Sequence, residues 1–136
     1  MKRMPVKRRR PVRGAAVTEF ALVLPLLVLV LFATIETCSM MYLEQTLKIA
    51  AYEGARVALI PGTTKSNVEA AVNQVLDDRH VATGKVSISP ANYNNAAIGT
   101  FIRVTASAPT KGNSLVGAWF YGGRTLTSSV EMMKEN

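Results

Sequence analysis

The chain has 136 residues, which is enough for one small folded domain beside a membrane segment. Its net charge of +7 is carried by the first 14 residues, because the rest of the chain holds equal numbers of basic and acidic side chains. A basic N-terminal run can indicate a nucleic-acid-binding tail. Here the run directly precedes a long apolar segment, so the positive-inside rule explains it and no nucleic-acid partner is expected.

The first predicted element is a membrane helix that follows Gly14. Residues 15–35 are mostly apolar, and at about 1.5 Å per helical residue they span roughly 31 Å, close to the hydrocarbon thickness of a bilayer. The charge asymmetry places the N-terminus in the cytoplasm. We therefore predict a basic cytoplasmic leader at 1–14, a transmembrane helix at 15–36 and an extracytoplasmic domain at 37–136.

One carboxylate, Glu19, lies inside the predicted membrane segment. An acidic side chain at membrane depth is costly, so it marks a functional site by default. If the chain were cut after Gly14, Ala15 would become the first residue and Glu19 the fifth. The competing interpretation is an ordinary membrane helix whose glutamate lies by chance near the cytoplasmic end.

Two other N-terminal signals fit less well. The apolar run is longer than the 7–15 residues of a secretory signal peptide, and no small-x-small cleavage site follows it. Cys38 suggests a lipoprotein site, but Glu36 and Thr37 precede it where small or apolar residues are needed. Cys38 is instead expected to be a reduced or buried thiol, with a cross-link between two chains as the alternative.

The helix is predicted to continue beyond the membrane, from Glu36 to Leu59, and to end at Ile60-Pro61-Gly62. Glu44 with Lys48 and Glu53 with Arg56 are predicted ion pairs on its wetter side. Small residues at Ala51, Gly54, Ala55 and Ala58 let another backbone approach closely. We expect that neighbour to be the sheet or second helix of the same domain, with another subunit as the alternative. The apolar stripe of this part contains Leu43, Leu47, Ala50, Ala51, Gly54, Val57 and Ala58.

The remaining chain predicts a second helix and a small sheet. Ser66 and Glu69 have the spacing of a capping box, which opens a helix that runs to about Arg79. Alternating patterns predict three strands, which we expect to form an antiparallel sheet against the helices. The strands are predicted at residues 85–89, 101–106 and 125–132. The predicted fold class is therefore α+β, with a long N-terminal helix, a second helix and a small three-stranded antiparallel sheet.

Between the last two strands, residues 115–121 are apolar and aromatic. They form either a helical turn over the sheet or an exposed patch, and we expect Trp119 and Phe120 to pack into the core or as a lid.

No catalytic apparatus is evident in the sequence. His80 is the single histidine and Cys38 the single cysteine, and a helix and a turn separate them, so a Cys–His pair is not expected. A metal site would need more ligands than these. We therefore predict no enzymatic activity, no cofactor and no metal.

Two motifs give the chain a family resemblance. The sequence from Gly14 to Pro25 reads GAAVTEFALVLP and resembles a type IV prepilin processing site: a basic leader, a glycine, a glutamate five residues later and a long apolar run. The sequence at 45–56 reads QTLKIAAYEGAR and looks like a signature of TadE/TadG-like proteins. Thr18 replaces a valine that is common in that family, which is a minor departure. Beyond Pro61 no motif carries the resemblance.

The resemblance implies a pilin-like fold and a pseudopilin of the tight-adherence (Tad, Flp-type) pilus or secretion system. A prepilin peptidase would cut after Gly14, Ala15 would supply the new amino group, and Glu19 would pair with such an amine on a neighbour. Pro25 would kink the helix or serve as a flexible point when it leaves the bilayer. The family motif ends in Glu53, Gly54, Ala55 and Arg56.

The implied partners are the prepilin peptidase, other pilin or pseudopilin subunits, an inner-membrane assembly platform and the membrane. The implied location is the inner membrane with one spanning helix and the C-terminal domain outside, or a surface pilus. The competing function is that of an unprocessed, single-pass membrane protein whose outer domain binds a ligand or partner. Removal of the leader distinguishes the two.

Overall fold

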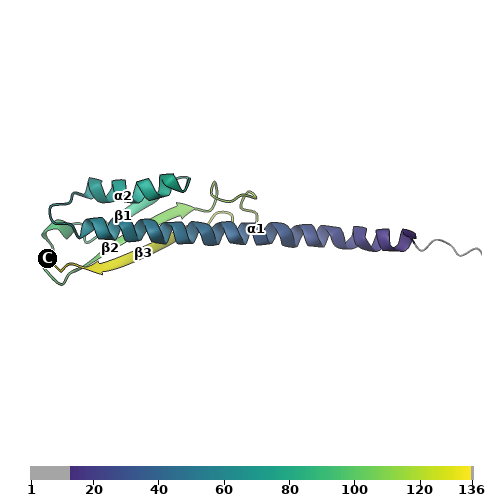
Figure 1. The fold of residues 1–136 in the computed structure, drawn as a ribbon, viewed down its shortest axis with the longest axis horizontal. Coiled ribbons are helices and arrows are strands. Elements are labelled where there is room, and N and C mark those ends of the chain that lie inside the picture. The colour runs from purple at the N-terminus through teal and green to yellow at the C-terminus, as the bar shows by residue number, and fades with distance from the viewer. Residues whose placement is uncertain (1–12, 136) are drawn as a thin grey trace, which may run out of the picture. The chain divides into compact units, whose positions relative to one another are not determined.

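The computed structural model describes residues 13–135, and the predicted leader therefore lies almost wholly outside the described residues. Two helices are followed by three strands, with a short 3-10 helix between the first two strands (Figure 1). The predicted α+β fold is confirmed. The elements are α1 (Arg13–Ala58), α2 (Lys65–Asp78), β1 (Lys85–Ser89), η1 (Tyr93–Asn95), β2 (Phe101–Pro109) and β3 (Thr125–Met133).

The chain divides into two compact units between Ala33 and Thr34, and α1 contributes to both. We call residues 14–33 the apolar unit and residues 34–135 the C-terminal unit. In the apolar unit, residues 14–32 are all exposed. By length and composition α1 can cross a membrane, and the mean hydropathy of its most apolar window is 2.5.

Within the C-terminal unit, α1 buries one face. Its predicted apolar stripe is confirmed for the most part, although Val57 is only partly buried. The helix ends at Ala58, and the predicted terminator follows with Gly62 in the left-handed region at a φ of 78°. The buried residues are Glu36, Met40, Leu43, Thr46, Leu47, Ala50, Ala51, Gly54, Ala55 and Ala58.

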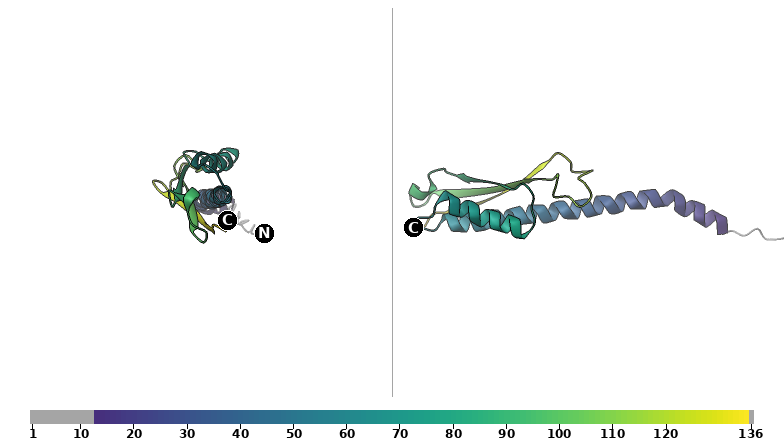
Figure 2. Two further views of the ribbon diagram at one scale, coloured as in Figure 1. Left: turned by 90° about the vertical axis from the view of Figure 1, so that its left-hand side faces the viewer. Right: turned by 90° about the horizontal axis from the view of Figure 1, so that it is seen from above.

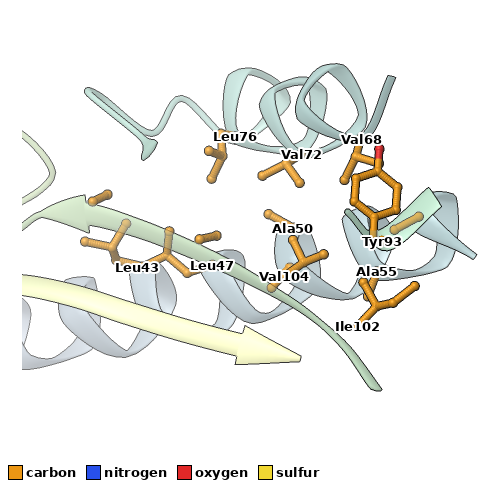
Figure 3. Packing of buried hydrophobic residues seen from close by; sticks show 14 residues of the cluster. Leu43, Leu47, Ala50, Ala55, Val68, Val72, Leu76, Tyr93, Ile102 and Val104 are labelled. Atoms are coloured by element: carbon orange, nitrogen blue, oxygen red, sulfur yellow. The ribbon is translucent and has the colours of Figure 1, made fainter. Parts of the chain in front are cut away.

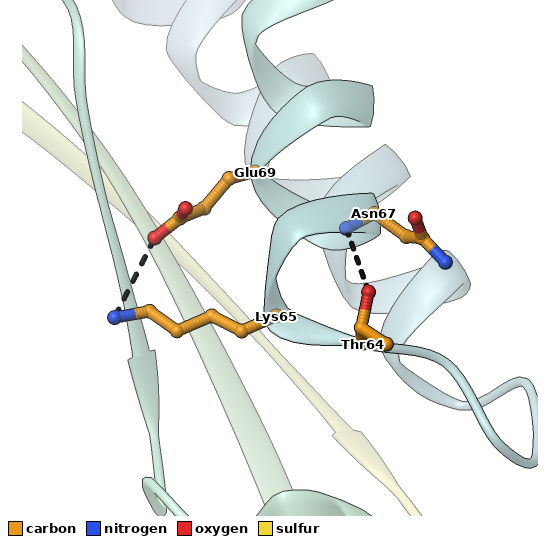
Figure 4. A network of polar contacts seen from close by, with 4 residues as sticks. All are labelled: Thr64, Lys65, Asn67 and Glu69. Carbon is orange, nitrogen blue, oxygen red and sulfur yellow. Dashed lines mark hydrogen bonds and ion pairs between the residues drawn. The ribbon is translucent and has the colours of Figure 1, made fainter.

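The second helix begins earlier than the capping-box prediction placed it. Thr64 is the N-cap, and its hydroxyl accepts a hydrogen bond from the Asn67 backbone N–H at 3.4 Å (Figure 4). The prediction of Ser66 as the cap is wrong, because Ser66 already lies inside the first turn. Glu69 instead pairs with Lys65 at 3.5 Å across one helical turn.

The three strands form one antiparallel sheet in the order β1-β2-β3. The central strand is buried at every second residue, namely Ile102, Val104, Ala106 and Ala108. The predicted strands are confirmed, and β2 continues three residues further, to Pro109, because β3 pairs with it along that whole length. Figure 2 shows the sheet beside the helices of the C-terminal unit from two further sides.

The core lies where α1, α2 and β2 meet (Figure 3). Gly54 is central to this junction. A Cβ atom placed on it would lie 2.5 Å from Val72 Cγ2 of α2 and 3.0 Å from Val104 Cγ1 of β2. The small residues of α1 therefore admit the sheet and second helix of the same unit, as predicted.

Candidate functional site

The predicted processing residues lie in the first turns of α1. Gly14 is exposed, and a Cβ placed on it would meet no atom of the described residues within 4 Å apart from its chain neighbours and the nearby backbone of its own helix. The Thr18 hydroxyl donates a hydrogen bond to the Ala15 carbonyl at 2.7 Å and lies 3.3 Å from the Gly14 carbonyl. The peptide bond between Gly14 and Ala15 is thus part of the first helical turn, where backbone N–H groups lack helical partners.

Glu19 lies one turn further along α1 than Ala15 and is exposed. Its neighbours on the helix are apolar and exposed as well, with Phe20 at 59% and Leu22 at 81% of their full accessibility. An isolated carboxylate on such a surface requires a compensating partner when the surface lies in lipid. Pro25 lies inside the helix, which continues through it. The roles predicted for Glu19 and Pro25 remain predictions.

The four residues that end the family motif have two different positions. Glu53 and Arg56 form an ion pair of 3.4 Å on the outer side of α1, where exposed pairs contribute little to stability. Gly54 and Ala55 face the core and are buried. The motif therefore combines a surface pair with the close packing of α1 on α2 and β2. The other predicted pair, Glu44 with Lys48, is not among the three ion pairs of the described residues.

The sequence analysis missed the role of Glu36. This side chain is fully buried, and its carboxyl group accepts hydrogen bonds from two backbone N–H groups. Phe120 N–H donates to Oε1 and to Oε2, each at 3.1 Å, and Tyr121 N–H donates to Oε1 at 3.0 Å. A buried carboxyl group is costly unless it is hydrogen-bonded. Glu36 therefore ties α1 to a segment 84 residues later in the chain.

A signal for this role exists in the sequence. Glu36 is in phase with the apolar stripe of α1, which continues through Met40, Leu43 and Leu47 at spacings of four and three. A charged residue on the core-facing side of a helix needs a partner inside the fold. The sequence does not reveal which partner.

We call residues 110–124 the aromatic loop. Its backbone is held by polar side chains of its own. The buried Thr110 hydroxyl donates to the Tyr121 carbonyl at 2.7 Å and lies 3.0 Å from the Arg124 carbonyl. The Ser114 hydroxyl accepts from the backbone N–H groups of Val116 and Ala118 at 3.3 and 3.1 Å.

Three large apolar side chains of this loop, Leu115, Trp119 and Phe120, are exposed. Trp119 is 77% exposed and Phe120 is 47% exposed, and Leu115 reaches 84%. The prediction that Trp119 and Phe120 pack into the core or as a lid is therefore wrong, and the exposed patch is the correct alternative. The reason is that the Glu36 carboxyl group binds the backbone N–H groups of Phe120 and Tyr121. This contact leaves the side chains of Trp119 and Phe120 on the outer side.

A groove of about 580 Å³ lies in the C-terminal unit between α1, the end of α2 and the aromatic loop. It is lined mostly by apolar atoms, with Arg79 and His80 among its residues. Cys38 also lines it, and its thiol is free and exposed; of the two expected states, the reduced thiol agrees with the structure and the buried thiol does not. The fold brings Cys38 and His80 to one groove, although the sequence suggested that they are separated.

Titratable groups elsewhere do not gather into a metal centre. In residues 13–135, no group of three His, Cys, Asp or Glu side chains is arranged to hold a metal ion. Burial, and secondarily the nearby Glu69 carboxylate, raise the pKa of the Tyr93 hydroxyl above its usual value of 10.0. That hydroxyl lies 3.4 Å from the Thr63 carbonyl, to which it donates.

Comparison with protein families matches residues 14–56 to the TadE family, described as TadE-like protein. The predicted resemblance is confirmed, and both motifs that carry it lie inside the matched segment. TadE-like proteins are a structural family associated with Tad pili and are not enzymes. One N-terminal apolar helix fits a single-pass membrane protein of such a system. Comparisons with curated proteins and with solved structures found no match.

Proposed function

We propose that this chain, whose residues 14–56 are TadE-like, is a minor pilin or pseudopilin that serves as a structural or initiating subunit of a Tad-type pilus or secretion system. The observation that carries the proposal is the extent of the family match, which begins at Gly14, the residue that precedes the proposed cut. From there the chain runs through an exposed apolar helix into the packed core of the C-terminal unit.

The first proposed step is hydrolysis of the peptide bond between Gly14 and Ala15 by a prepilin peptidase. Water adds across the bond, so that the leader leaves with a carboxylate on Gly14 and the mature chain begins with an amine on Ala15. Two features support this site. Gly14 has no side chain, and among the described residues the position of a Cβ on it faces open space. It also lies in the first helical turn, which is the easiest turn to unwind.

The second proposed step is assembly through Glu19. A neighbouring subunit's new α-amino group would pair with this carboxylate and so offset the cost of placing it in lipid. The exposed position of Glu19 on the apolar surface of α1 supports this role, because a partner can reach it. Pro25 would provide a flexible point when the helix moves from the bilayer into a filament.

The proposed location follows from the same arrangement. The basic leader would stay in the cytoplasm, the apolar unit would cross the inner membrane once, and the C-terminal unit would lie outside. The proposed partners are the prepilin peptidase, other pilin-like subunits and the inner-membrane assembly platform. No enzymatic reaction is assigned to the chain itself.

Processing is tested by determining the N-terminus of the protein extracted from membranes of a host with an active prepilin peptidase. The wild-type protein should begin at Ala15. Gly14→Val should keep the leader because the larger side chain blocks the cut, whereas the control Ala21→Val should be processed normally. A wild-type protein that still begins at Met1 would reject the pseudopilin function.

Assembly is tested by site-specific cross-linking to the major pilin and to a second copy of the chain. Glu19→Ala should be inserted and cleaved, because the cut depends mainly on Gly14. Its cross-linking should fall several-hundred-fold, since breaking a buried ion pair costs about 3–5 kcal/mol. Glu44→Ala removes an exposed carboxylate from the C-terminal unit and is the matched control. Unchanged cross-linking and piliation in Glu19→Ala would exclude Glu19 from assembly.

The alternative function is that of an unprocessed single-pass membrane protein with a binding domain outside. The observation that favours it is the groove beside Arg79 and His80, because mostly apolar grooves with a few polar groups are typical of binding sites. This function requires that the leader remain attached, so the N-terminal determination decides between the two.

A further inference from the structure

The aromatic loop is tied to α1 at one defined level. Glu36, whose carboxyl group holds the backbone N–H groups of Phe120 and Tyr121, directly follows the apolar run that ends at Ile35. A second contact joins the same places, because the Thr37 and Tyr121 hydroxyls lie 3.4 Å apart. If the apolar run crosses the bilayer, these bonds hold the loop where hydrocarbon gives way to headgroups.

The side chains that the loop exposes are those that favour this environment. Leu115 and Trp119 are more than three-quarters exposed, and Phe120 is about half exposed. The C-terminal unit has a well-packed core, with several residues at 0% exposure. The exposure of Leu115, Trp119 and Phe120 is therefore not the result of a missing core. Tryptophan and tyrosine are enriched where membranes meet water, since one part of the ring is apolar and another is polar.

The two charged side chains within the aromatic loop itself are both positive. Lys111 and Arg124 are exposed, and no acidic residue occurs between Asp78 and Glu131. Arg124 lies over the Tyr121 ring, with 5.9 Å between the guanidinium carbon and the ring centroid. Basic side chains flanking an apolar tip favour a surface that carries anionic phospholipids.

The backbone of the loop is also suited to a region with little water. Thr110, Ser114 and Asn113 bind backbone groups inside the loop or next to it. Asn113 further joins the loop to Ala82, which donates to its side-chain oxygen at 2.7 Å and accepts from its amide nitrogen at 3.0 Å. Polar backbone groups that are satisfied within the protein lower the cost of entering the interface.

We propose that the aromatic loop is a second membrane contact, which inserts Leu115, Trp119 and Phe120 among anionic phospholipid headgroups on the face where the C-terminal unit emerges. With α1 as the first contact, the loop fixes the orientation of the C-terminal unit on the bilayer. The proposal goes beyond the pseudopilin function and requires only that the apolar run span the bilayer, so it does not depend on processing or on a pilus.

Trp119 is the single tryptophan of the chain and therefore serves as the probe. The full chain is reconstituted in vesicles of phosphatidylethanolamine and phosphatidylglycerol that carry a nitroxide quencher either near the headgroup or deep in the acyl chain. We expect a blue-shifted emission that the shallow quencher reduces several-fold more than the deep one. Emission that is unshifted and unquenched would overturn the proposal. A blue shift without lipid quenching would also overturn it, because it would place the loop against another protein subunit.

The double variant Trp119→Phe, Tyr52→Trp provides the reference position. Tyr52 is 50% exposed and lies 16 residues beyond Glu36 on α1, which separates the two residues by roughly 24 Å along the helix. Tryptophan at this position should not be quenched by either label. Equal quenching at both positions would mean that the whole unit lies on the lipid, and the loop would not be the contact.

Two exposed substitutions test the apolar tip. Leu115→Asp places an acidic group in the loop, so Trp119 quenching should fall several-fold in anionic vesicles. Ile98→Asp is the matched control, because Ile98 is 74% exposed and precedes β2, whereas the loop follows the other end of that strand. Both side chains are exposed, so the fold should persist in both variants. Unchanged quenching in Leu115→Asp, or an equal fall in both variants, would reject the insertion of the loop.

Discussion

The two parts of α1 have opposite relations to their surroundings although both are rich in apolar residues. In the apolar unit, large side chains such as Leu22 and Leu31 are exposed on every side of the helix. In the C-terminal unit, one face is fully buried and carries small residues such as Ala51 and Gly54 beside Leu47.

The difference shows what distinguishes a lipid-facing helix from a core helix. A helix that faces lipid needs apolar side chains on all of its sides, but their exact sizes matter little. A helix that faces a protein core needs side chains whose size fits particular neighbours, which is why Gly54 stands where Val72 and Val104 approach. The same substitution should therefore have different effects in the two parts.

The largest contrast is expected for leucine. Leu47→Ala should lower the free energy of unfolding of the C-terminal unit by about 2–5 kcal/mol, because Leu47 is fully buried and a cavity remains. Leu27→Ala, at a position that is 52% exposed, should leave this free energy unchanged. Urea unfolding of both variants of the full chain in detergent, followed by circular dichroism, measures the difference. Equal losses would mean that the apolar unit contributes to the core.

Glycine provides a second contrast. Gly54→Ala adds a methyl group 2.5 Å from Val72 Cγ2, and overpacking of this kind costs about 1–3 kcal/mol. Alanine favours the helix more than glycine does, and this preference offsets up to about 1 kcal/mol of that cost. We expect a net loss of about 1–2 kcal/mol in the same measurement, and no change for Gly14→Ala. A more stable Gly54→Ala protein would show that the close approach of the three elements is not needed.

A substitution at Thr46 should have a smaller effect on the free energy of unfolding, and in the opposite direction. Among the described residues, its hydroxyl is the buried side-chain oxygen without a hydrogen-bond partner. Thr46→Val keeps the shape and removes the unsatisfied group, so the C-terminal unit should gain about 1 kcal/mol. The control Thr127→Val, on the exposed face of β3, should change the stability by less than about 0.5 kcal/mol. Thermal unfolding of both variants in detergent tests this, and a destabilised Thr46→Val protein would reveal a hydrogen bond at Thr46.

The smallest effect at ordinary pH concerns Tyr93 in the core. Its pKa is raised above 10.0, so the folded state binds the phenolic proton more tightly than the unfolded state. The stability that results is complete below pH 10 and is lost as the pH rises from this value through the higher pKa of the folded state. Tyr93→Phe should therefore lose stability less steeply than the wild type above pH 10.

The control for this comparison is Tyr52→Phe, which changes an exposed tyrosine of α1 and should keep the wild-type slope. Urea unfolding at several alkaline pH values measures all three proteins. Identical slopes in the wild type and Tyr93→Phe would show that Tyr93 ionises equally easily in both states.

The sequence by itself determined the elements of this protein and their type. The length and apolarity of residues 15–35, the stripe of the following helix and the alternation of the strands are local patterns, and local periodicity is set by the geometry of helix and strand. The family motifs could also be recognised from the sequence, because they depend on the spacing of residues along the chain. Gly14 and Glu19 belong to the first motif, and the second ends at Arg56.

Only the tertiary structure decided what the side chains of distant segments do. Glu36 reaches Phe120, 84 residues away, and this bond leaves Trp119 and Phe120 on the outer side although the apolar composition of their segment suggests a core. Thr64 rather than Ser66 caps α2 because the chain enters the helix there in an extended conformation. In each case the outcome depends on which backbone groups are brought together, and the folded arrangement fixes these partners where the spacing of residues does not.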